Sequence, residues 1–200
     1  MTDHTGRVGL EKDELYAVAH EFDKLRTEIS VPGTPRELPD LATASKHLAT
    51  LTGLIKDLSD EVVFRVTENE PGLDLKPVIY AYTSAASLAG QATENYTEAY
   101  IQLGFLHRYA DAPETKELRD ARHAAFLIAQ ERTGTVRNDL TDAARGLRRS
   151  ADRLDGTPPR TLAALSRSAR PTNSIYRLPP QTPTPSTTRL AYTPAPRHAR

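Results

Sequence analysis

Apolar and small residues recur at alternating spacings of three and four through residues 75–110. The column comprises Leu75, Val78, Tyr82, Ala85, Ala89, Ala92, Tyr96, Ala99, Leu103, Leu106 and Ala110. This spacing puts every member on one stripe of an α-helix, where it can be buried against neighbouring helices. Because the middle of the stripe is alanine, a partner backbone can approach closely there. We therefore predict one long helix over residues 75–110 and expect it to be the most buried element.

Three further segments carry the same pattern and predict helices over residues 10–29, 40–69 and 112–154. The first has its apolar residues at Leu15, Val18, Phe22, Leu25 and Ile29. The second has Leu41, Ala44, Leu48, Leu51, Ile55, Leu58, Val62 and Val66. The last has Phe126, Ala129, Thr133, Val136, Leu140, Ala143, Leu147 and Leu154. The chain thus alternates narrow apolar stripes with polar faces, as helices of a bundle do.

Acidic residues mark where three of these helices begin. Asp40 is a good N-cap for the second helix. Asp74 is placed to cap the third helix, just before its first turn. Asp111 and Glu114, three residues apart, form the pattern of a capping box for the fourth helix.

Glycine residues suggest where the first helix begins and where the fourth helix is weakest. Residues 1–9 are polar and contain two glycines, so we expect them to be frayed. Glu11 and Glu14 would then lie in the first helical turn, where the helix dipole favours negative charge. In the fourth helix, Gly134 between two threonines predicts a kink or a break recapped at Asn138, because glycine in a helix interior costs about 1 kcal/mol relative to alanine.

The predicted fold class is all-α. The connections between the second, third and fourth helices are only a few residues long, so these helices should be antiparallel neighbours. We predict an elongated up-down four-helix bundle of long heptad-patterned helices over residues 10–155.

The remaining 45 residues differ sharply in composition. Residues 156–200 contain seven Arg, nine Pro and no acidic residue, whereas residues 1–155 contain 19 Lys and Arg against 26 acidic residues. The net charges are therefore +7 and −7. We predict a short helix over residues 158–168, followed by a disordered, basic, Pro-rich tail. Such asymmetry indicates a basic tail on an acidic body. It is explained either by solubility and weak attraction of the tail to the body, or by a tail that seeks an anionic partner.

Composition excludes several function classes. The chain has no Cys, which excludes disulfides and Cys-ligated metal sites. No apolar run approaches the roughly 20 residues of a membrane span, and the first residues have no secretory-signal pattern. We therefore expect a cytoplasmic protein without membrane contact. Arg outnumbers Lys 20 to 6, which we interpret as the codon usage of a GC-rich bacterial genome.

Candidate catalytic groups are few, and we predict no catalytic, cofactor-binding or metal site. His20 with Asp23, and Asp120 with His123, share helix faces, but they lie among other charges, and two Glu-x-x-His pairs typical of di-iron bundles are absent. The segment from Ala19 to Phe22 resembles the phospho-accepting box of sensor histidine kinases. That resemblance implies phosphotransfer on His20, although the basic-Thr-Pro continuation is missing.

A second resemblance lies at the start of the tail. Residues 162–175, LAALSRSARPTNSI, resemble the helix–turn–helix of repressor-like DNA-binding domains, except that the turn lacks glycine. The resemblance implies DNA contact. The candidate phosphate-binding residues are Arg145, Arg148, Arg149, Arg153, Arg160, Arg167 and Arg170.

The tail also carries a short pattern of the polyproline II type. Residues 177–183, RLPPQTP, fit Arg-x-x-Pro-x-x-Pro, which aromatic grooves of partner proteins recognise. The candidate partner-binding residues there are Tyr176, Arg177, Pro180 and Pro183. With nine prolines in the tail, one such match is expected by chance.

These observations favour a non-enzymatic interaction or scaffold protein. Its bundle would offer helix faces to a protein partner or to a second copy, and its basic tail would recruit a partner. Two alternatives remain open at this point. One is a DNA-associated accessory protein that uses the Arg-rich region over residues 145–170, with at most weak nonspecific nucleic-acid binding expected. The other is a phosphotransfer bundle using His20.

Overall fold

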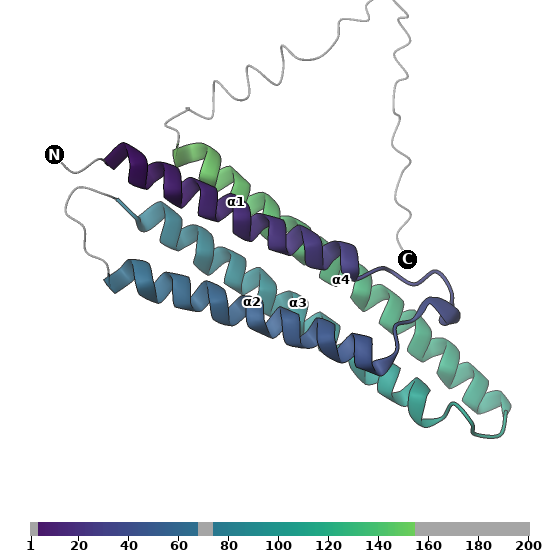
Figure 1. Ribbon diagram of the computed structural model, residues 1–200. Helices are drawn as coiled ribbons and strands as arrows, with labels where there is room; N and C mark the ends of the chain where they lie inside the picture. Colours follow the sequence, from purple (N-terminus) through teal and green to yellow (C-terminus); the bar gives the residue numbers. More distant parts are fainter. Residues whose placement is uncertain (1–3, 68–73, 155–200) are drawn as a thin grey trace, which may run out of the picture. The chain divides into compact units, whose positions relative to one another are not determined.

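The computed structural model describes residues 4–67 and 74–154. Within these ranges it contains α1 (His4–Glu28), α2 (Leu41–Thr67), α3 (Lys76–Arg108) and α4 (Lys116–Leu154), with a short 3-10 helix, η1 (Pro35–Glu37), between α1 and α2 (Figure 1). The described part has no strand. The predicted all-α four-helix bundle is therefore confirmed. The helix and the disordered tail predicted for residues 156–200 lie outside the described residues.

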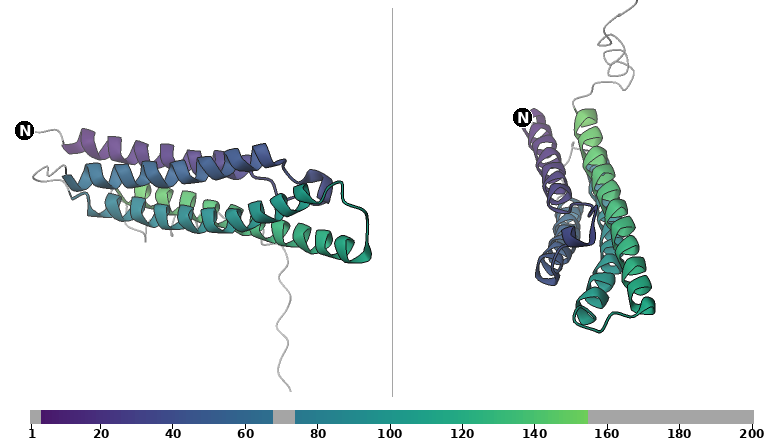
Figure 2. Two further views of the ribbon diagram at one scale, coloured as in Figure 1. Left: turned by 90° about the horizontal axis from the view of Figure 1, so that it is seen from below. Right: turned by 90° about the vertical axis from the view of Figure 1, so that its right-hand side faces the viewer.

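The four helices form two layers. The closest backbone approaches join α3 to α4, α2 to α3, and α1 to α4. Figures 1 and 2 show α1 and α2 in one layer over α4 and α3 in the other, with successive helices antiparallel. The end of α3 and the start of α4 extend past the connection between α1 and α2 (Figure 1). The backbones of α1 and α2 approach each other less closely than those of these three pairs.

The apolar stripe of α3 is buried as predicted. Every stripe residue from Leu75 to Leu103 is buried, and Tyr82 and Tyr96 are among the largest fully buried side chains. The stripe ends earlier than predicted, because Leu106 is only partly buried and Ala110 is exposed beyond the helix end. α3 buries nine of its 33 residues, a slightly larger share than the ten of 39 in α4.

α1 begins six residues before the predicted start. It runs from His4 through both glycines, and the pair Arg7–Glu11, at 3.4 Å between Nε and Oε1, spans the added turns. Glu11 is therefore not in the first turn of the helix. Its side chain is buried, so its position reflects a specific partner rather than the helix dipole.

The predicted stripe of α2 is wrong at its last member. Ala44, Leu51 and Leu58 are buried, and the next buried residue is Arg65, whereas Val66 is 63% exposed. The buried positions of α2 therefore recur every seven residues. The prediction took two successive steps of four after Leu58, which rotated it one residue off the buried face.

Two predicted helix starts are supported by hydrogen bonds, and one is wrong. Asp40 Oδ1 accepts the N–H of Thr43 at 2.6 Å, and Asp74 Oδ1 accepts the N–H of Lys76 at 3.2 Å. α4 begins at Lys116 instead of residue 112. Its cap is Thr115, whose hydroxyl accepts the N–H of Leu118 at 3.2 Å.

The capping box predicted for α4 does not form, because Glu114 binds other groups. Its carboxylate accepts hydrogen bonds from Arg119 at 3.1 Å and from Arg122 at 2.7 Å. Arg122 also donates to the carbonyl of Ala110 at 3.1 Å, near the end of α3. These contacts satisfy carbonyls that a helix end leaves without intrahelical partners.

α4 is continuous through Gly134 and Asn138, so the predicted break is absent. Both flanking threonines return their hydroxyls to the helix. Thr133 donates to the carbonyl of Ala129 at 2.7 Å, and Thr135 donates to that of Glu131 at 3.3 Å. Thr133 is also buried in the stripe that faces the other helices. Packing along α4 thus outweighs the local helix propensity of one glycine.

α4 also holds the connection between α1 and α2. Arg137 donates to the carbonyls of Arg26 at 2.9 Å and Ile29 at 2.7 Å. Gln130 donates to the carbonyl of Pro32 at 2.7 Å. The last carbonyls of α1 are therefore satisfied by a cation, which the negative end of the helix dipole favours.

Candidate functional site

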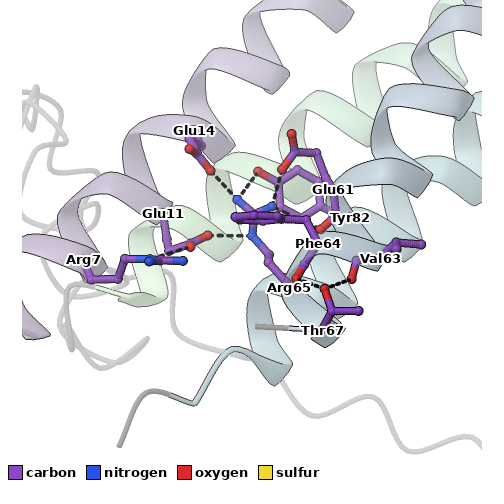
Figure 3. Close-up of polar contacts among 9 residues, drawn as sticks. All are labelled: Arg7, Glu11, Glu14, Glu61, Val63, Phe64, Arg65, Thr67 and Tyr82. Atoms are coloured by element: carbon purple, nitrogen blue, oxygen red, sulfur yellow. Dashed lines mark hydrogen bonds and ion pairs between the residues drawn. The ribbon is translucent and has the colours of Figure 1, made fainter. Parts of the chain in front are cut away.

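A buried charged cluster joins α1, α2 and α3 (Figure 3). Its centre is Arg65, whose side chain is 1% exposed. The guanidinium donates from Nε to Glu11 at 2.7 Å, and also binds Glu14 of α1 and Glu61 of α2. Its Cζ lies 4.5 Å from the ring centre of Tyr82 in α3, a cation–π contact.

The cluster is built to fix helices rather than to react. Burial alone would lower the pKa of Arg65, but the hydrogen bonds to Glu61 and Glu11 outweigh it and raise that pKa. Burial also raises the pKa of Tyr82 above its usual value. Arg65 therefore stays charged and Tyr82 stays neutral. The backbones of α1 and α2 make few close approaches, so this cluster is a main polar link between the two helices.

The four predicted phosphate-binding arginines of the bundle do not act as one group. Arg148 pairs with Asp23 of α1, and its hydrogen bond lowers the pKa of that carboxyl. Arg145 pairs with Asp142 at 2.6 Å. Arg149 and Arg153 are exposed and have no ion-pair partner among the described residues.

The other predicted site residues of the tail lie outside the described residues. They are Arg160, Arg167, Arg170, Tyr176, Arg177, Pro180 and Pro183. The structure therefore neither supports nor opposes the helix–turn–helix or the polyproline pattern.

The histidine pairs weighed as metal or phosphate sites lie apart from further ligands. His20 is exposed on α1, and its neighbour Asp23 is bound by Arg148 and by Arg26 at 3.4 Å. Asp120 and His123 are both exposed on α4. Over residues 4–67 and 74–154 no three metal-ligating side chains gather.

A charged stripe runs along the last half of α4. It consists of Asp139, Asp142, Gly146, Arg149 and Arg153, at successive spacings of three, four, three and four. All but Asp139 are exposed, and the buried residues of α4 occupy other positions. We call these five residues the α4 stripe. Its two acids precede the glycine and its two arginines follow it.

Beside the α4 stripe lies a groove of about 280 Å³ between α3 and α4. Its floor is made of small residues, including Ala81, Ala85, Ala143 and Gly146. Tyr80, which is 72% exposed, and Leu88 stand at its α3 side. Only residues of α3 and α4 line the groove, so neither α1 nor α2 covers it.

The negative charge of Asp139, at the acidic end of the stripe, is only partly compensated by its neighbours. Asp139 accepts a hydrogen bond from the side-chain amide of Asn95 at 3.1 Å. Burial, together with the nearby Asp142 carboxylate, raises its pKa in spite of that bond. Arg132, which donates to the other side of the Asn95 amide at 3.3 Å, is itself bound to Glu98 at 2.6 Å. A positive charge brought from outside would therefore stabilise the ionised form of Asp139.

No protein-family model, curated protein or solved structure matches this chain. Among the helices of the described part, none combines the length and the apolarity needed to cross a membrane.

Proposed function

We propose that this protein is a non-enzymatic interaction or scaffold protein whose bundle pairs with a second copy through the α4 stripe. In this proposal the basic segment over residues 156–200 recruits an anionic partner to the paired bundles. The observation that carries the proposal is the order of charges along the α4 stripe, acid–acid–glycine–arginine–arginine.

This order is self-complementary when two copies of α4 run antiparallel. With the two-fold axis at Gly146, Asp139 of one copy lies level with Arg153 of the other, because each is seven residues from the axis. Asp142 lies within one residue of the level of Arg149 by the same count. Each pair occurs twice, as an isologous interface requires. A parallel arrangement would instead place like charges together.

The surfaces beside the stripe suit close helix packing. Gly146 lines the groove, and a Cβ added there would meet no atom within 4 Å, so the bundle leaves open space at this position. Tyr80 and Leu88 offer apolar surface next to it, which an interface of charges alone would lack. Arg149 and Arg153 have no ion-pair partner of their own among the described residues, and the existing pair that competes with the new contacts is the exposed Asp142–Arg145 pair at 2.6 Å.

Reversing the two arginines should separate the copies. We expect Arg149→Glu/Arg153→Glu to weaken dimerisation about 30-fold or more, because four pairs worth roughly 0.5–1 kcal/mol each become repulsive. Sedimentation velocity over a concentration series measures this, and the wild-type dimer should weaken as salt is raised. A wild-type protein that stays monomeric at every concentration would contradict the proposal.

Two further double variants make the test specific for the α4 stripe. Arg108→Glu/Lys116→Glu changes the net charge equally at exposed positions outside the stripe, and should dimerise as the wild type does. Asp139→Lys/Asp142→Lys should be monomeric alone, yet form a heterodimer when mixed with Arg149→Glu/Arg153→Glu. Circular dichroism checks that each variant is folded. Failure of the mixture to associate, with both variants folded, would refute the antiparallel pairing.

A further inference from the structure

A cavity of about 160 Å³ lies where the end of α1, the α1–α2 connection, α2, α3 and α4 meet. Its buried walls are mostly apolar, with Ile29, Ala99, Leu103 and Ala129 among them. This cavity is separate from the α4 stripe and from the Arg65 cluster, and shares no residue with either. For scale, an engineered apolar cavity of about 150 Å³ takes up benzene.

Two polar side chains face each other in this cavity. His47 Nδ1 and the Tyr96 hydroxyl are 2.8 Å apart, and their rings meet edge to face at 5.8 Å between centres. Burial lowers the pKa of His47, although the Glu28 carboxylate opposes this effect. Burial also raises the pKa of Tyr96. At neutral pH both groups are therefore uncharged and supply hydrogen bonds rather than charge.

The charged residues that line the cavity are all acidic. They are Glu28 and Glu37, and both are exposed, whereas the apolar walls are buried. The carboxylates therefore stand toward the mouth of the cavity. Glu37 is held by the N–H of Gly33 at 2.8 Å and the hydroxyl of Thr34 at 3.0 Å, and these bonds lower its pKa, so it stays ionised.

No Lys or Arg neutralises this mouth from within the lining. The nearby Arg137 directs its guanidinium to the carbonyls of Arg26 and Ile29 and is not among the lining residues. Glu28 has no hydrogen-bond or ion-pair partner among the described residues. The cavity thus combines an apolar interior of ring size with an anionic entrance.

We propose that this cavity binds a small organic cation, an apolar ring or short chain that carries one protonated amine. The apolar part fills the space between Ile29, Ala99 and Leu103, and the ammonium group lies between the carboxylates of Glu28 and Glu37. The His47–Tyr96 pair supplies a hydrogen-bonding group at the inner side. This site is independent of the pairing of two bundles.

The test uses three molecules of one size and different charge, titrated into the full-length protein by calorimetry. Benzylamine should bind, benzyl alcohol should bind about twofold to fivefold more weakly, and benzoate should not bind, because an exposed ion pair contributes at most about 1 kcal/mol. Binding of benzylamine should also shift the NMR signals of the His47 ring. Equal binding of benzoate and benzylamine, or no binding of benzylamine at millimolar concentration, would overturn the proposal.

Two variants locate the site. Glu28→Gln should weaken benzylamine binding about twofold to fivefold and leave benzyl alcohol unaffected, while Glu21→Gln, an exposed acid on the same helix, should change neither. Ala99→Leu should fill the cavity and abolish binding of both ligands. If that variant fails to fold, the comparison of Glu28→Gln with Glu21→Gln still decides. Benzylamine binding that is equal in Glu28→Gln and the wild type would refute this site.

Discussion

Ala89→Arg is expected to unfold or open the bundle. Ala89 is fully buried at the middle of the α3 stripe, where the neighbouring stripe members are also alanine. A guanidinium there has neither space nor an acidic partner, and burying an unpaired charge costs several kcal/mol. Overpacking of a close helix contact adds to this cost. A thermal melt followed by circular dichroism should show a midpoint lowered by ten degrees or more, or no cooperative transition, by the usual scaling of roughly 2–4 °C per kcal/mol.

Gln91→Arg is the matched control for that substitution. Gln91 is exposed two residues further along α3, so the same added charge reaches solvent. Its melting midpoint should stay close to that of the wild type, since surface substitutions usually change stability by at most about 0.5 kcal/mol. Equal midpoints for both variants would mean that the register of α3 is wrong.

Arg65→Met is expected to destabilise the bundle by about 3–5 kcal/mol, because it leaves the buried Glu11 carboxylate without its main partner. Methionine keeps much of the side-chain length, so the loss reports charge more than volume. Urea unfolding followed by circular dichroism measures the free energy of unfolding.

Two comparisons separate charge from packing at this cluster. Arg65→Met/Glu11→Leu removes both buried charges and should recover most of the lost stability, because replacing a buried pair by apolar residues is often neutral. Lys56→Ala breaks the exposed Lys56–Asp60 pair, 2.8 Å apart, and should change the free energy by at most about 0.5 kcal/mol. If the double variant is as unstable as Arg65→Met, an uncompensated Glu11 is not the cause.

The fold could be predicted from sequence because its main signal is periodic. The α3 stripe, the helix order and the cap at Asp40 follow from spacing and local hydrogen bonding, which act within one helix. Helix ends were harder to predict from spacing, and the predicted start of α4 was wrong. The start of α4 depends on Glu114 binding Arg119 and Arg122 instead of its own backbone, and side-chain partners of this kind leave no mark in the spacing.

The Arg65 cluster was not predicted, because the apolar stripe predicted for α2 ended at Val66 and did not include Arg65. Its burial requires carboxylates from α1, which are 51 and 54 residues away in the chain. A strict seven-residue count from Ala44 through Leu51 and Leu58 would have indicated position 65. Spacings of three or four residues also permit the path from Leu58 through Val62 to Val66, which the prediction followed.

The two candidate sites differ in how much of each could be predicted from the sequence. The charges of the α4 stripe are present in the sequence at heptad spacing, but their exposure, and the pairing of Arg145 and Arg148 with other acids, required the structure. The cavity was beyond sequence, because His47 and Tyr96 come from different helices and neither belongs to a motif.

Because the chain has no Cys, disulfide formation by single-cysteine variants measures the antiparallel pairing of α4 at defined positions. Gly146→Cys should give a covalent dimer under mild oxidation, since the residue meets its own mate at the two-fold axis, within the reach of a disulfide. Arg153→Cys should not, because its mate would lie roughly 21 Å away along the helix, yet mixed with Asp139→Cys it should give the heterodimer. Rapid dimerisation of Arg153→Cys alone, or none of Gly146→Cys, would contradict the pairing.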